Sequence, residues 1–197
     1  MKSLNYILLL IIVAMCCIGS CRKPIPPKPF FPLDEEMRAY FAVPDSGSWY
    51  VYQDSASGVF DTMRVKNRRD HIIGNLPYLG EGYSLFYTCT QSPNFRTDVS
   101  TQDDGYTFSL SYSIGGAHRI SKDSSGFSPR EKVKILDSLV VEGVKYESVI
   151  QSADNFNYGQ AYRKLWFSKG VGIVKKQAIS NQGGYDAVFN LINYQIE

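Results

Sequence analysis

The sequence predicts an all-β fold, an antiparallel meander of about nine or ten strands forming a curved sheet or half-barrel, with a short N-terminal helix. The clearest observation is the run at residues 106–114, where apolar and hydroxyl-bearing residues alternate. Period-two alternation places the apolar side chains on one face of a strand, which no helix would do. Glycine-containing turns separate such runs at short intervals. Because a one-sided sheet must cover its apolar face, a β-sandwich or a closed lipocalin-like barrel is the alternative.

Residues 1–20 have the features of a bacterial signal peptide. Lys2 supplies a positive charge, and residues 6–15 form an apolar run that is too short to span a bilayer comfortably. Residues 18–21 read Ile-Gly-Ser-Cys and resemble a lipobox, in which the chain is cut before a cysteine that carries diacylglycerol. We therefore expect Cys21 to be the acylated N-terminus of a lipoprotein. The alternative is a generic secretory signal in which Cys21 is incidental.

Residues 21–33 predict a lipidated cysteine followed by a proline-rich tether. Five of the nine prolines of the chain lie here, and proline favours extended backbone. Such a segment would hold the domain about 35–40 Å from the membrane. No aspartate follows Cys21 directly and no acidic cluster follows it, so neither inner-membrane retention nor surface export is indicated. The expected location is the outer membrane, on the periplasmic side, with the membrane as a partner through Cys21.

Residues 34–197 form the predicted β domain. Residues 34–42 begin with acidic side chains and place Met37, Tyr40 and Phe41 at helical spacing before Pro44, which predicts the short helix. Longer irregular loops are expected at residues 70–80 and 123–130, and a bulge in the last strand near Leu191 and Ile192. The clearest predicted strands are residues 49–53, 59–66, 83–90, 106–114, 133–141, 144–150 and 162–179, the last interrupted at 170–172, with a final strand after the turn at 181–184.

The charge and cysteine content exclude some classes of protein. A formal net charge of +2 does not favour nucleic acid as a partner, because binding it requires a concentrated basic surface. Of the four cysteines, only Cys89 remains after the predicted cleavage and acylation, so a mature monomer holds no disulfide. Alternation in its strand predicts that Cys89 faces inward as a small buried side chain.

The sequence offers no candidate for a catalytic, metal or cofactor site. The only imidazoles, His71 and His118, lie in no motif, and adjacent Asp103 and Asp104 precede a glycine and predict a turn. The Gly-Val-Gly at residues 170–172 lacks the third glycine and the helix start of a dinucleotide loop. The basic doublets at residues 68–69 and 175–176 are interpreted as solvated strand ends. We therefore predict no catalytic residue.

Three segments carry a resemblance to a known group. These are a hairpin at residues 141–149 with glycine at its turn, the run Trp-Phe-Ser-Lys-Gly-Val-Gly-Ile-Val-Lys at residues 166–175, and Trp-Tyr-Val-Tyr at residues 49–52. Together they resemble uncharacterised envelope lipoproteins of Bacteroidota, and more distantly the half-barrels of lipoprotein carriers. The resemblance implies a fold and a compartment, and it supplies no catalytic residue.

The function expected from the sequence is non-enzymatic binding of a lipid, a peptide or an envelope partner in an apolar concavity. A face rich in tyrosine suits a partly open groove, because buried hydroxyls need partners. The alternatives are a carbohydrate-handling accessory protein or hydrolase, a structural envelope protein, and an ordinary aromatic core. The predicted ligand-binding residues are Tyr83, Tyr87, Tyr106, Phe108, Tyr112, Trp49 and Trp166.

Overall fold

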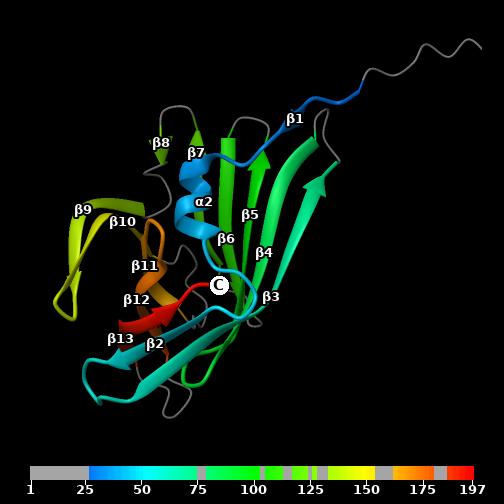
Figure 1. Ribbon diagram of the computed structural model, residues 1–197. Helices are drawn as coiled ribbons and strands as arrows, with labels where there is room; N and C mark the ends of the chain where they lie inside the picture. The colour runs from blue at the N-terminus through cyan, green and yellow to red at the C-terminus, as the bar shows by residue number, and fades with distance from the viewer. Residues whose placement is uncertain are drawn as a thin grey trace, which may run out of the picture.

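The computed structural model describes residues 27–74, 79–102, 105–112, 117–123, 126–127, 133–153, 162–179 and 186–197. Within these residues the protein is one curled β-sheet with one short helix, which confirms the predicted all-β half-barrel (Figure 1). The predicted signal peptide and Cys21 lie outside the described residues. The elements are β1 (Phe30–Phe31), α2 (Glu35–Phe41), β2 (Trp49–Asp54), β3 (Phe60–Ile73), β4 (Leu79–Cys89), β5 (Phe95–Gln102), β6 (Gly105–Tyr112), β7 (Ala117–Asp123), β8 (Gly126–Phe127), β9 (Val133–Val141), β10 (Val144–Ala153), β11 (Tyr162–Ser168), β12 (Gly172–Ile179) and β13 (Asp186–Gln195).

The strand order of the sheet is β8-β7-β6-β5-β4-β3-β2-β13-β12-β11-β10-β9, and each neighbouring pair on this path is antiparallel. The short β1 adds a parallel pairing to β4. The chain enters the sheet at its middle, meanders outward to β8, and returns from the other edge to β13, which pairs with β2. The two edges, β8 and β9, do not pair in the described part of the chain, so the sheet is an open half-barrel.

The helix α2 lies inside the curl of the sheet. Figure 1 shows it between the wall formed by β3–β7 and the wall formed by β9–β13. It contacts β6 on the first wall and β11 and β12 on the second, and β7 and β10 also approach each other. The concave face is therefore covered by the helix, and the half-barrel has a filled interior.

Local sequence accounts for the limits of α2. The Asp34 side chain accepts a hydrogen bond from the Met37 backbone N–H at 3.1 Å and caps the first turn. Met37, Tyr40 and Phe41 fall on one face of the helix and are buried against the sheet. The prediction of a helix at residues 34–42 is confirmed, with one residue at each end serving as a cap.

Most predicted strands are confirmed, whereas the predicted loop at residues 70–80 is contradicted at both ends, and its middle, residues 75–78, lies outside the described residues. There β3 continues to Ile73 and β4 begins at Leu79, because the β3–β4 ladder extends beyond the core to the rim of the sheet. The buried positions of β4 at this end are Gly80 and Gly82, which carry no apolar side chain, so the sequence shows no alternation of apolar residues there. The predicted bulge is confirmed by a register shift between Leu191 and Asn193. Within the predicted loop at residues 123–130, Asp123 ends β7 and Gly126–Phe127 form β8, while the rest lies outside the described residues.

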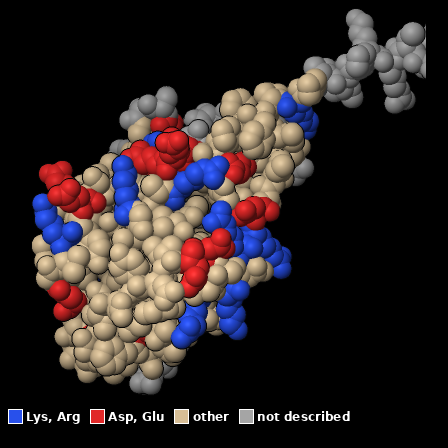
Figure 2. All heavy atoms as spheres, viewed as in Figure 1, with Lys and Arg blue, Asp and Glu red and all other residues tan. Residues whose placement is uncertain are grey.

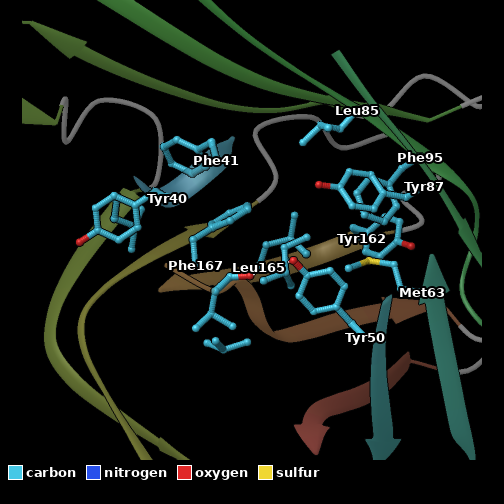
Figure 3. Packing of buried hydrophobic residues seen from close by; sticks show 14 of the residues in the cluster. Tyr40, Phe41, Tyr50, Met63, Leu85, Tyr87, Phe95, Tyr162, Leu165 and Phe167 are labelled. Carbon is cyan, nitrogen blue, oxygen red and sulfur yellow. Dashed lines mark hydrogen bonds between the residues drawn. The ribbon is translucent and has the colours of Figure 1, made fainter. Parts of the chain in front are cut away.

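The buried residues follow the inner face of the sheet, which we define as the face that carries Tyr50 and Tyr52 and packs towards α2. Buried tyrosines donate to backbone carbonyls, with Tyr50 Oη 3.0 Å from the Val171 oxygen and Tyr52 Oη 2.9 Å from the Ile173 oxygen. These bonds satisfy hydroxyls that would otherwise be costly to bury. Figure 3 shows rings from α2, β2, β4, β5 and β11 meeting in this core.

The interpretation of the basic doublet Lys175–Lys176 as a solvated strand end is wrong for Lys176. Its side chain is fully buried on the inner face, where Nζ lies 2.7 Å from Asp61 Oδ2 and 3.0 Å from Ser92 Oγ. Its neighbour Lys175 points to the opposite, outer face and lies over the ring of Trp166. Alternation in β12 therefore sends one lysine outward and the other into a closed ion pair.

Candidate functional site

The candidate site is the space between α2 and the inner face of the sheet. A small cavity remains there, with about 10 Å³ of free volume, which is space for one water molecule. The helix and the segment after it close one side, and β2, β3, β4 and β5 contribute to the other (Figure 3). Residues that line it include Tyr40, Phe41, Tyr50, Met63, Tyr87 and Thr97.

One lining residue has an unsatisfied polar group. Thr97 is 2% exposed, and its Oγ1 makes no hydrogen bond of regular geometry among the described residues. The neighbouring hydroxyl belongs to Tyr87, whose pKa is raised by burial and is lowered in part by Thr97. A buried hydroxyl without a regular partner is uncommon in native proteins and marks a position that a polar atom of a ligand, or a water, would satisfy.

Two predicted ligand-binding residues, Tyr83 and Tyr87, lie on the inner face and are buried. Tyr87 lines the cavity and stacks on Phe95, with ring centroids 4.5 Å apart. Tyr83 lies nearer the rim, where its hydroxyl donates to Glu81 and accepts from Arg38. The structure thus brings Tyr87 to the cavity and places Tyr83 in the polar cluster beside α2.

Trp49 and Trp166 lie on the outer face, away from the cavity. Trp49 pairs across the sheet with Arg64, and Trp166 pairs with Lys175, whereas their sequence neighbours Tyr50 and Phe167 belong to the core. Residues directly opposite on paired strands share a face. Both indoles are only half-buried. Neither tryptophan borders the concavity.

The remaining predicted residues, Tyr106, Phe108 and Tyr112, lie in β6. The backbone register pairs Phe108 with Val99 and Tyr112 with Phe95, and both partners are buried. Their positions are therefore in register with the inner face. The placement of their side chains lies outside the described residues, as do Asp103 and Asp104.

Ion pairs join the N-terminal turn of α2 to both walls of the sheet. Lys122 Nζ in β7 lies 2.8 Å from Asp34 Oδ1 and 3.2 Å from Glu36 Oε2, while Lys169 Nζ lies 3.2 Å from Glu36 Oε1. Burial alone would raise the pKa of Asp34, but the hydrogen bonds from Lys122 and Met37 outweigh it and hold that pKa below its usual value. The pKa of Glu36 is lowered for the same reason by Lys122 and Lys169.

A second polar group fastens the helix further along. Arg38 donates to Glu81 in β4, and Tyr40 Oη donates to the Ser148 carbonyl in β10. Burial would raise the pKa of Glu81, but hydrogen bonds from Tyr83, the Leu33 N–H and Arg38 lower it. The helix is therefore bound by polar contacts at the rim and by three buried side chains beneath.

The buried cluster around Lys176 is closed to substrates. Asp61 accepts from Lys176, from Ser92 Oγ at 2.5 Å and from the Thr90 and Gln91 backbone N–H groups. The side chains of Asp61 and Lys176 have no exposed surface. Ser92 therefore donates to a carboxylate that is already paired, and we interpret the cluster as structural.

Cys89 packs against the core, as its predicted inward orientation requires, but it is only partly buried. Its Sγ lies 3.7 Å from Tyr162 Oη, and burial raises the pKa of its thiol. A thiol with a raised pKa is a poor nucleophile at neutral pH. Among the described residues no cluster of three or more metal-ligating side chains occurs.

Sequence reasoning missed Thr97, Met63 and the role of α2. Thr97 shares the inner face of β5 with Phe95 and Val99, but a threonine is itself no sign of a buried position, and no strand was predicted at residues 95–102. In the part of the chain that the structure describes, no helix has the length and apolar character needed to cross a membrane. Comparison of the chain with protein-family models, curated proteins and solved structures gives no match.

Proposed function

We propose that the protein is an envelope lipoprotein, anchored through Cys21, that binds the apolar chain of a lipid or peptide on the inner face of the sheet beneath α2. The observation that carries this proposal is the cavity between α2 and the sheet, with the buried hydroxyl of Thr97 beside that of Tyr87 at its wall and without a hydrogen bond of regular geometry among the described residues. Most of the residues that line it are aromatic or aliphatic. It combines a few hydroxyl groups with a mainly apolar lining, which is typical of sites for amphipathic ligands.

Binding requires α2 to move, because the cavity as it stands holds only one water molecule. The helix has seven residues, which is too short to be stable without its tertiary contacts. Burial of Met37, Tyr40 and Phe41 contributes about 1.5–3 kcal/mol each, so opening α2 costs roughly 5–9 kcal/mol. An acyl chain contributes about 0.8 kcal/mol per buried methylene, so roughly a dozen methylenes would offset that cost.

Hydrolysis is a weaker proposal. Ser92, whose Oγ lies 3.0 Å from Lys176 Nζ, belongs to the closed cluster with Asp61 and Lys176. Binding of glycans is also less well supported, because the outer-face tryptophans pair with Arg64 and Lys175 and not with carboxylates.

The proposal is tested by titrating the mature chain carrying Cys21→Ser with a fluorescent fatty acid. We expect saturable binding that Thr97→Leu weakens at least about fivefold, because the larger side chain fills the cavity. Thr62→Leu, on the outer face of the adjacent sheet region, is the matched control and should bind as the unsubstituted chain does. Thermal unfolding verifies that both variants are folded. Absence of saturable binding to fatty acids and to apolar peptides would reject the proposal.

A further inference from the structure

A second apolar surface lies far from the cavity, at the corner where β1 meets β4 and the end of β3. Phe30 and Phe31 are 52% and 49% exposed, and Ile72 is 64% exposed. We call these three residues the β1 corner. In Figures 1 and 2 it is the upper right part of the molecule, where the described chain begins.

The backbone holds the β1 corner in place. Phe30 and Phe31 pair with Leu79 and Gly80, and the opposite side of Gly80 pairs with Ile73. The Leu33 N–H donates to Glu81 at 2.8 Å, and Lys28 Nζ donates to the Gly74 carbonyl at 2.9 Å. Two exposed phenylalanines are thus presented by a paired strand. Consecutive strand residues point to opposite faces, so β1 exposes one ring on each side of the sheet edge. Large apolar side chains that gather at one exposed edge are typical of an interaction surface.

The position of this surface in the chain indicates what it contacts. Cys21 lies nine residues before Phe30, so the acylated residue would be at most about 32 Å from the corner even with fully extended backbone. Arg22 and Lys23 directly follow Cys21 in the sequence, and Lys28 lies two residues before Phe30. Aromatic side chains next to basic ones suit the interface of an anionic bilayer, where rings enter the headgroup region and the cations pair with lipid phosphates.

We propose that the β1 corner docks on the lipid surface to which Cys21 anchors the chain. This inference rests on the anchor of the proposed function and is independent of ligand binding under α2. The lipid holds the corner near the bilayer, and the two rings then fix the orientation of the half-barrel on it. Because β1 joins directly to the segment that leads into α2, the docked corner would place the helix close to the membrane.

The test is flotation of the mature chain carrying Cys21→Ser with vesicles of phosphatidylethanolamine and phosphatidylglycerol. We expect measurable partitioning that Phe30→Ser/Phe31→Ser weakens about tenfold, because two rings no longer enter the interface. Phe60→Ser is the matched control, since Phe60 is equally exposed at 54% but lies at the far end of β3, and it should bind as the unsubstituted chain does. Ile72→Ser, on a different strand of the same corner, should also weaken binding.

Several outcomes would overturn the docking proposal. These are no vesicle binding, equal loss with Phe60→Ser, binding that salt removes and the phenylalanine substitutions leave unchanged, or self-association that the double substitution abolishes. Thermal unfolding identifies any variant that fails to fold. Fatty-acid binding measured on the same variants separates the two proposals, because the corner substitutions should leave it unchanged.

Discussion

Lys176 and Asp61 form a buried ion pair on the inner face of the sheet. Both side chains are fully buried, and Lys176 lies 4.3 Å from the centre of the Tyr52 ring. Burial would raise the pKa of Asp61. The charge of Lys176, together with the hydrogen bonds that Asp61 accepts, outweighs this effect and holds that pKa below its usual value. The carboxylate therefore stays charged inside the core and depends on its partner.

We predict that Lys176→Met lowers the free energy of unfolding by about 3–5 kcal/mol, because it leaves Asp61 buried without a counter-charge. Adding Asp61→Asn should recover part of that loss. The adjacent Lys175→Met, which removes an outer-face lysine, should change stability by less than about 1 kcal/mol. Urea unfolding measures all three. A Lys176→Met protein as stable as Lys175→Met would show that the pair is not needed.

The helix α2 is the element on which the proposed function depends. Its capping carboxylate and first-turn glutamate have lowered pKa values in the folded protein, so they bind protons less readily folded than unfolded. Their contribution to stability is complete above their unfolded pKa values, near 3.8 and 4.5, and is lost as pH falls through the folded values. Acid should therefore loosen α2.

We predict that the urea midpoint falls as pH is lowered from about 5 to about 3, and that Asp34→Asn makes this fall shallower. Asparagine keeps the capping oxygen but cannot pair with Lys122 as a charge, so the variant separates capping from charge. Asp70→Asn, which removes a carboxylate from an exposed pair with Arg68, is the control for the substitution itself and should change stability at neutral pH by less than about 1 kcal/mol. An identical pH dependence in the Asp34 variant would contradict this assignment.

At the scale of the whole molecule, local patterns predicted the elements better than their arrangement. Alternation identified the β6 run, and the Asp34–Pro44 region identified α2, because each is decided by neighbouring residues. The central pairing of β2 with β13 joins strands from opposite ends of the domain and leaves no local sign. Alternation placed Tyr87 on the inner face, whereas Thr97 was missed because a hydroxyl gives no sign of burial.

The outward position of Trp49 and Trp166 has a similar cause. Aromatic content suggests a groove, but which face a residue occupies depends on strand register, and one position decides between the core and the outer surface. The concavity itself also differs from the expected open groove. It is filled by α2, so the proposed ligand can bind only when the helix is displaced.

The most direct test of that account is amide hydrogen exchange of the mature Cys21→Ser chain with and without saturating fatty acid. We predict that amides of α2, including the Arg38 and Ala42 N–H groups that bond within the helix, lose protection when ligand binds. Amides in β2 and β12 should keep or gain protection, because the ligand replaces the helix on the sheet. Saturable binding with α2 protection unchanged or increased would contradict the claim that the ligand occupies the space beneath the helix.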